Sequence, residues 1–150
     1  MKEGLNLSYH FYGWKDSGHV HAVNHTYKGI ITPCNLYDAL LHVWCEYTCT
    51  PRLRAQWTSD NPTLGQCAVT SFLAQDIFGG TVYGILQECG NFHCYNVVDD
   101  YAFDLTSEQF GGEILSYTGN PEQLREIHFQ RAEKRERYEY LCSELRECCM

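Results

Sequence analysis

Residues 57–80 read WTSDNPTLGQCAVTSFLAQDIFGG, which is a polar loop followed by an apolar segment that begins at Cys67. The loop is rich in Ser, Asp, Asn, Pro and Gly, the residue types that favour turns. After it, apolar residues recur at helical spacing: Ala68, Val69, Phe72, Leu73 and Ile77. Gly79 and Gly80 then end the periodic run, as glycine commonly does after a helix. The pattern therefore predicts a helix whose first turn contains Cys67.

A cysteine in the first turn of a helix has an unusual electrostatic environment. The backbone N–H groups there are unpaired, and the positive end of the helix dipole favours a thiolate over a thiol. We therefore expect Cys67 to be a nucleophile. The alternative is a structural thiol that the helix buries.

The period changes after Gly80 and indicates three short strands. Residues 81–89 predict the first strand, with Gly84 as a bulge or a point of close approach. Turns at residues 90–91 and 99–100 separate it from strands at 92–98 and 101–105. Strands joined by such short turns form an antiparallel sheet.

The second hairpin places a histidine and an aspartate on the same face of this sheet. A two-residue turn at 99–100 gives the pairs Val98 with Tyr101, Asn96 with Phe103 and Tyr95 with Asp104. His93 and Asp104 then become diagonal neighbours, with Cβ atoms about 7 Å apart. An imidazole and a carboxylate can bridge that distance. Cys67, His93 and Asp104 are therefore candidates for nucleophile, base and orienting acid.

The remaining chain predicts further helices around this sheet, which makes the fold class α+β with helices packed on a small antiparallel sheet. Residues 35–48 have helical periodicity with Asn35 as the cap, and Asn120-Pro121 predicts the start of a long helix over 121–147. Thr106 and Gln109 have the spacing of a capping box. We expect one domain over 1–150, with 1–33 as an N-terminal extension or hairpin and 34–147 as a catalytic-like core.

The charge of the chain argues against binding to nucleic acid. The formal net charge is -8 and the pI is about 5.2, whereas nucleic-acid-binding proteins have a basic face. One basic cluster is interleaved with acids, and we interpret it as a solvated helix face. The cluster comprises Arg131, Lys134, Arg135 and Arg137, with Glu133, Glu136 and Glu139 between and beside them.

Nine cysteines at irregular spacings do not indicate a disulfide framework. We recognise no signal peptide and no apolar run of 18 residues, so we expect a cytoplasmic protein with reduced thiols and no membrane partner. No cofactor and no metal are expected. A zinc site at His19, His21 and His25 is the alternative, but no cysteine or carboxylate lies at a recognisable motif distance.

Several motifs in the chain resemble the YunG-type family of small uncharacterised bacterial and phage proteins. In order, they are S-D-N-P from Ser59, G-Q-C-x-V-T from Gly65, G-G from Gly79, H-x-x-N from His93 and D-L-T-x-x-Q-F from Asp104. The resemblance covers about residues 35–145 and departs from the family at Tyr95, where we expect Trp. It implies a papain-like or transglutaminase-like core, with Cys on a helix N-terminus and His and Asp on adjacent strands. It implies no established substrate.

We therefore expect a cysteine-dependent hydrolase or acyl transferase, peptidase- or amidase-like, that cleaves an amide or ester bond through Cys67, His93 and Asp104. The substrate would be an unknown peptide, amide or ester. An oxyanion would be bound by the Cys67 backbone N–H and by the side-chain amide of Gln66 or Asn61. The alternative is a catalytically silent binding or inhibitory module of the same fold, as in a phage-type protein.

Overall fold

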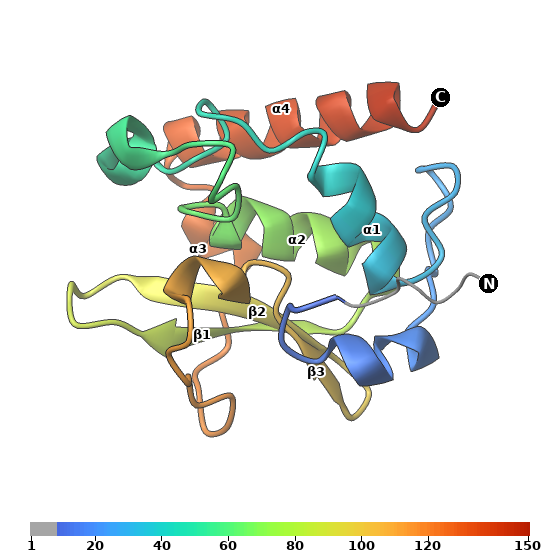
Figure 1. Cartoon of the computed structure of the whole chain (residues 1–150), viewed down its shortest axis with the longest axis horizontal. Helices are drawn as coiled ribbons and strands as arrows, with labels where there is room; N and C mark the ends of the chain where they lie inside the picture. Colours follow the sequence, from blue (N-terminus) through green and yellow to red (C-terminus); the bar gives the residue numbers. More distant parts are fainter. Residues whose placement is uncertain (1–8) are drawn as a thin grey trace.

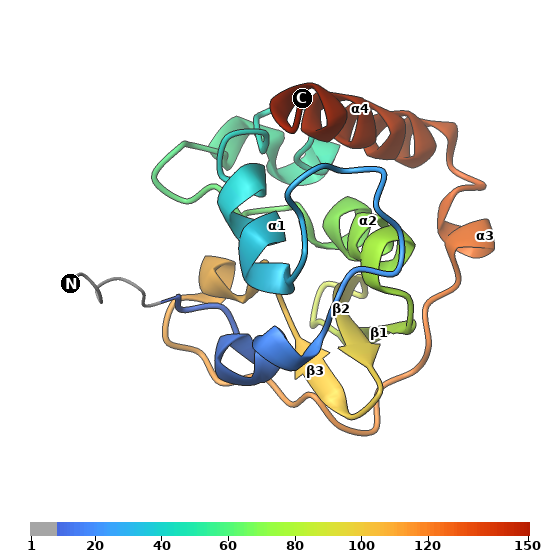
Figure 2. The same cartoon turned by 90° about the vertical axis from the view of Figure 1, so that its right-hand side faces the viewer.

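Helix α2 (Cys67–Phe78) lies at the centre of the molecule in a computed structural model that describes residues 9–150. Below it in Figure 1 is a three-stranded antiparallel sheet in the order β1 (Thr81–Leu86), β2 (Phe92–Val98) and β3 (Tyr101–Phe103). Above it lies α4 (Ala132–Cys148), and Figure 2 shows α1 (Pro33–Leu40) beside it. The predicted α+β class is confirmed.

Helix α2 is buried on several sides, as expected of a helix enclosed by other elements. Eight of its twelve residues are buried: Val69, Thr70, Ser71, Phe72, Leu73, Ala74, Ile77 and Phe78. Two buried polar bonds attach it to its neighbours. Trp44 Nε1 donates to Thr70 Oγ1 at 2.9 Å, and Asn96 Nδ2 donates to the carbonyl oxygen of Ser71 at 2.9 Å. The helix is therefore held at a defined position above β2.

The predicted helix and hairpin register are confirmed near the site. Helix α2 begins at Cys67 and is followed by Gly79 with φ 79°, and β3 pairs Asn96 with Phe103 and Val98 with Tyr101. The strands are shorter than predicted. Strand β1 ends at Leu86 and β3 ends at Phe103, so the predicted pair of Tyr95 with Asp104 is not part of the ladder. The backbone of Asp104 forms an isolated bridge with Tyr12, with a bond of 3.0 Å from Asp104 N–H to Tyr12 O.

The predicted long helix over 121–147 is wrong at its start. Gly84 N–H donates to Pro121 O at 3.0 Å and Gln123 N–H donates to Val82 O at 2.8 Å, so this segment pairs with the edge of β1. Helix α3 (Arg125–His128) and helix α4 follow separately. At Gly84 the ladder has no bulge, but a Cβ atom would lie 2.8 Å from the Gln123 side chain. Gly84 is thus a point of close approach.

The predicted helix over 35–48 is also shorter. It begins at Pro33, with Thr32 as N-cap and Asn35 Oδ1 accepting the Thr32 N–H at 3.0 Å. After Leu41 the chain turns and reaches a 3₁₀ helix, η3 (Pro51–Gln56). Two arginines bind the carbonyls of the turn. Arg54 contacts Glu46, Tyr47 and Cys49 at 3.0–3.1 Å, and Arg137 contacts Thr48 at 3.0 Å. These bonds satisfy carbonyls that a longer helix would have paired internally.

Residues 9–33 form no hairpin. They contain a 3₁₀ helix, η2 (Trp14–His19), and contribute four buried side chains to the main hydrophobic cluster: Phe11, Val20, Tyr27 and Ile30. His19, His21 and His25 are exposed, and within residues 9–150 no group of three or more potential ligands is arranged to hold a metal ion. Residues 1–8 of the predicted extension lie outside the described part.

The capping box predicted from Thr106 and Gln109 does not form. The short helix η4 (Ser107–Phe110) forms, but the Thr106 side chain does not cap it and instead bonds Asp104. Among residues 9–150, no helix is both long enough and apolar enough to cross a membrane.

Replacing Gly65 by alanine is expected to destabilise the fold by more than replacing Gly29. Both glycines have positive φ, at 70° and 86°, but a Cβ at Gly65 would lie 2.5 Å from Cys49 Sγ, whereas Gly29 has nothing within 4 Å. We expect Gly29→Ala to cost about 1 kcal/mol of unfolding free energy and Gly65→Ala about 3 kcal/mol, measured by urea denaturation. Equal losses would show that the Gly65 contact is not restrictive.

Candidate active site

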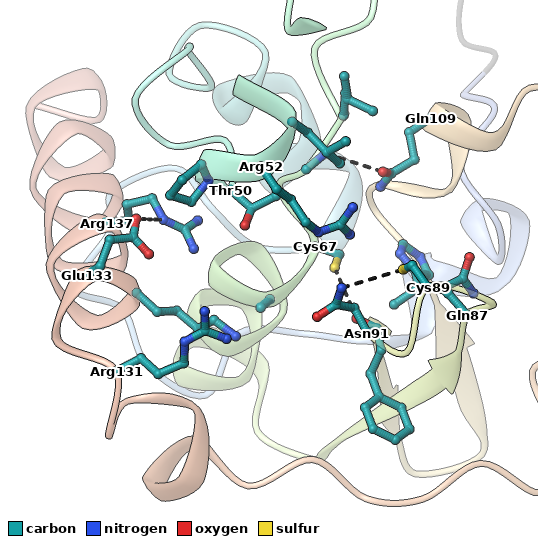
Figure 3. A pocket seen from close by; sticks show the side chains of 18 of the residues that line it. Thr50, Arg52, Cys67, Gln87, Cys89, Asn91, Gln109, Arg131, Glu133 and Arg137 are labelled. Carbon is teal, nitrogen blue, oxygen red and sulfur yellow. Dashed lines mark hydrogen bonds and ion pairs between the residues drawn. The ribbon is translucent and has the colours of Figure 1, made fainter. Parts of the chain in front are cut away.

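Cys67 is the first residue of α2 and faces a pocket of about 570 Å³ (Figure 3). The loop before it is fixed by two hydrogen bonds at Gly65. The Gly65 N–H donates to Gln109 Oε1 at 3.3 Å, and the Gly65 carbonyl accepts from Thr50 N–H at 2.9 Å. The thiol itself is half-buried, with Sγ 3.9 Å from the carbonyl oxygen of Phe92. Cys67 is therefore fixed in place at the wall of the pocket.

His93 and Asp104 form a buried pair next to this thiol. His93 Nε2 lies 2.6 Å from Asp104 Oδ2, and the two residues are 3% and 1% exposed. A carboxylate can only accept a hydrogen bond, so Nε2 carries the proton and donates it. The ring therefore has its Nδ1 atom free for another partner. His93 also lines the pocket, and the ring of Phe110 packs edge-on against it.

Asp104 accepts three further hydrogen bonds that hold it in place. Tyr117 Oη donates to Oδ2 at 2.7 Å, while Thr106 donates to Oδ1 from its backbone N–H at 3.1 Å and from Oγ1 at 3.3 Å. Tyr12 stacks on Tyr117 with ring centroids 3.7 Å apart. Four donors on one buried carboxylate compensate for the loss of water.

The proton distribution within the site favours a thiolate and an imidazolium. Hydrogen bonding with the Cys94 thiol, and then with the His93 ring and its positive charge, lowers the pKa of Cys67 well below its usual value, although burial opposes this. Burial alone would lower the pKa of His93. The charge of Asp104 and the hydrogen bond to it outweigh burial and raise that pKa to about 10. Both shifts favour a protonated ring and a negatively charged sulfur.

The two predicted oxyanion side chains do not line the pocket. Gln66 is fully buried, and its Nε2 donates to the carbonyl oxygen of Cys45 at 3.1 Å. Asn61 lies in the preceding turn, half-buried. The Cys67 backbone N–H has no hydrogen-bond acceptor in the part of the chain that the structure describes. This N–H is thus the predicted donor that is still available at the site.

The predicted solvated helix face is wrong for part of the basic cluster. Arg131, Lys134 and Arg137 all line the pocket, and Arg137 is 2% exposed. Arg135 is exposed outside it. Arg137 leaves solvent because it binds the Thr48 carbonyl and the carboxylate of Glu133, a tertiary contact that charge alternation along the chain cannot reveal.

The sequence interpretation missed three residues that contact the candidate groups. Tyr117 donates a hydrogen bond to Asp104, Gln109 accepts one from the loop before Cys67, and Cys94 belongs to the apolar cluster that Cys67 packs against and contributes to the lowered Cys67 pKa. Tyr117 lies in an irregular segment with no periodicity to place it. Cys94 follows His93 directly on β2, and because consecutive strand residues point to opposite faces, the alternation gave no signal that both lie near Cys67.

Labelling of Cys67 by iodoacetamide should persist below pH 7, because its pKa is lowered and only the thiolate reacts. His93→Gln removes a hydrogen bond and a positive charge that lower this pKa. The midpoint of the labelling curve should therefore move upward toward that of an ordinary thiol, and the rate at pH 6 should fall about tenfold for every pH unit by which the midpoint rises. Peptide mapping by mass spectrometry resolves Cys67 from the other eight thiols. The control variant His21→Gln, at an exposed histidine, should leave the labelling curve unchanged. An unchanged curve in His93→Gln would contradict the interaction of His93 with Cys67.

Asp104→Asn keeps an acceptor for His93 but removes the charge that raises its pKa. Burial then dominates, and the His93 pKa should fall by about 1–3 pH units in a histidine NMR titration, with slower labelling of Cys67 at pH 6. Tyr117→Phe removes one hydrogen bond and leaves the charge, so its effect on the His93 pKa should be smaller. If the His93 titration were the same in Asp104→Asn and in the unmodified protein, Asp104 would have no role in raising the His93 pKa.

Comparison with known proteins identifies the family. The family profile described as "YunG protein" matches residues 32–149. The chain is 36% identical over 87 residues to the uncharacterized protein YunG of Bacillus subtilis (strain 168), covering 58% of this chain and 72% of that protein. No solved structure matches the chain. The matched region contains α2, the sheet and α4, and with them Cys67, His93 and Asp104, so the chain belongs to the YunG family.

Proposed function

We propose that the protein is a cysteine-dependent hydrolase or acyl transferase that acts on an amide or ester bond, with Cys67 as nucleophile, His93 as acid and base, and Asp104 as the orienting group. One observation carries the proposal: a thiol with a lowered pKa opens into a pocket beside a histidine that a buried carboxylate holds. Perturbed ionisable groups in a cleft are characteristic of catalytic sites.

The first chemical step follows from the proton positions. The Cys67 thiolate attacks the carbonyl carbon, and the carbonyl π electrons move to oxygen. His93, protonated on Nδ1, then gives that proton to the departing nitrogen or oxygen as the C–N or C–O bond breaks. A thioester on Cys67 remains. Water or an amine attacks it next, His93 takes up the proton of the attacking group, and the thiolate is released.

The developing oxyanion needs donors at the start of α2. The Cys67 backbone N–H points from the first turn of a twelve-residue helix, and Gln66 makes no side-chain capping bond there. The positive end of the helix dipole favours both the thiolate and the oxyanion. Gln66 and Asn61 keep the role of oxyanion donor only if the loop moves, because their side chains lie away from the pocket lining.

The order of elements supports a papain-like or transglutaminase-like arrangement. Such a core places the nucleophile on a helix N-terminus and its partners on adjacent strands, and this chain has Cys67 first in α2, His93 on β2 and Asp104 directly after β3. We also propose a cytoplasmic location. All nine cysteines are free thiols, which suits a reducing compartment.

A covalent intermediate tests the proposal directly. With p-nitrophenyl acetate, we expect one equivalent of p-nitrophenolate in a burst and an acetyl group on Cys67, located by peptide mapping. His93→Gln should slow acetylation by about 10²- to 10⁴-fold. Cys67→Ala should abolish the burst, and the control Cys142→Ala should retain it.

Acetyl groups spread evenly over the nine thiols would contradict the proposal. That result would favour the binding or inhibitory module, which needs the pocket but no reactive sulfur.

A further inference from the structure

The pocket at Cys67 is positively charged although the protein is acidic. The chain has 11 Lys and Arg residues against 19 Asp and Glu residues. Four of those 11 cations line this one pocket: Arg52, Arg131, Lys134 and Arg137. Its lining includes a single carboxylate, Glu133. In Figure 3, Arg52 approaches from η3, and Arg131 and Arg137 approach from α4 on another side.

The carboxylate of Glu133 is already bound to other groups. Arg137 Nε donates to Glu133 Oε2, and Arg54 Nη2 lies 3.7 Å from the same oxygen. In the described part of the chain, Arg52, Arg131 and Lys134 have no carboxylate within ion-pair distance. Within residues 9–150, these three cations therefore line the pocket without a carboxylate partner.

The position of two of these cations is unfavourable for the helix that carries them. Arg131 is the N-cap of α4 and Lys134 lies in its first turn. The positive end of a helix dipole stabilises acidic side chains and repels cations. A local arrangement that opposes the stability of its own element is expected at functional sites.

Lys134, which lines the pocket, is fixed by a chain of polar side chains. Its Nζ donates to His128 Nδ1 at 2.9 Å, and the other ring nitrogen of His128 donates to Gln123 Oε1 at 2.9 Å. Burial lowers the pKa of Lys134, and burial together with the Lys134 charge lowers the pKa of His128 to about 4. His128 is therefore neutral and acts as an acceptor for the lysine. A half-buried ammonium group with no carboxylate partner suits an anion that arrives with the substrate.

We infer that the substrate carries an anionic group, a carboxylate or a phosphate, beside the bond that Cys67 attacks, and that Arg131 and Lys134 bind this group. The inference rests on the proposed function and adds the substrate class. Arg131 contributes a planar guanidinium that matches either anion, and Lys134 contributes a compact charge. The two act as specificity-determining residues.

Two alkylating agents of similar size test the inference. Iodoacetate is anionic and iodoacetamide is neutral, and in both reactions the thiolate attacks the CH₂ carbon and iodide leaves. The ratio of the two rate constants at Cys67 cancels any change in thiolate fraction. We expect this ratio to exceed that of N-acetylcysteine in the same buffer by about tenfold, and to fall as salt is raised.

Neutral variants localise the effect. Arg131→Gln and Lys134→Gln should each lower the iodoacetate to iodoacetamide ratio several-fold, and the double variant should lower it further, leaving the smaller contribution of Arg52. Arg135→Gln, on the same helix but outside the pocket, should leave the ratio unchanged. Rapid labelling by iodoacetamide with no preference for iodoacetate would overturn the anionic substrate while leaving the proposed function intact. Slow labelling by both agents would instead count against the proposed function.

Protection experiments distinguish the two kinds of anion. Glutarate, phosphate and the neutral glutaramide are each added before iodoacetamide, and Cys67 labelling is followed. Protection by glutarate assigns a carboxylate, and protection by phosphate assigns a phosphate. Equal labelling in the presence of glutarate, phosphate and glutaramide would overturn the inference.

Discussion

The hydrogen bond from His93 to Asp104 is the interaction on which the site depends. Both groups are removed from water, and burying them would be costly without compensation. Tyr117 and Thr106 supply that compensation on the carboxylate, and the Asp104 backbone is fixed by its bond to Tyr12. The ring of His93 is thereby held in one orientation and with one proton position. Together with Cys94, the ring held in this way lowers the pKa of the Cys67 thiol.

The central helix then brings the sulfur to the histidine. Because α2 is enclosed by the sheet and α4, its start cannot shift without disturbing the core. Gly65 allows the loop to approach Cys49 closely just before the helix begins. The same packing leaves the first turn open on one side, where the pocket lies. Rigid support and an accessible sulfur are thus provided by different faces of one element.

Local patterns in the sequence were sufficient to predict the parts of the site that regular structure determines. The helical spacing after Cys67 located α2, and a two-residue turn with alternating faces placed His93 near Asp104. Asn96 is a buried polar residue of β2, and its hydrogen bond to the Ser71 carbonyl oxygen compensates for its burial. These features are encoded within about 40 neighbouring residues.

Features that depend on distant contacts could not be predicted in this way. Asn120-Pro121 is locally a good helix start, but in the fold this segment forms backbone hydrogen bonds with the edge of β1 at Gly84. Helix α1 ends at Leu40, and Arg54 and Arg137 bind carbonyl oxygens of the following turn that the periodicity would assign to the helix. Tyr117 reaches Asp104 from an irregular loop. In each case a tertiary bond outweighs a local preference, and single-sequence patterns do not record such bonds.

The proton shared between Cys67 and His93 has a consequence for acid and base stability. A raised histidine pKa alone would stabilise the fold below 6.5 and lose that stability as the pH rises through about 10. A lowered cysteine pKa alone would stabilise it above 9.0 and lose that stability as the pH falls. The two slopes oppose each other, because folding moves one proton from sulfur to ring and changes the number bound very little. The two pKa values can therefore be strongly shifted for chemistry while the free energy of unfolding changes very little across neutral pH.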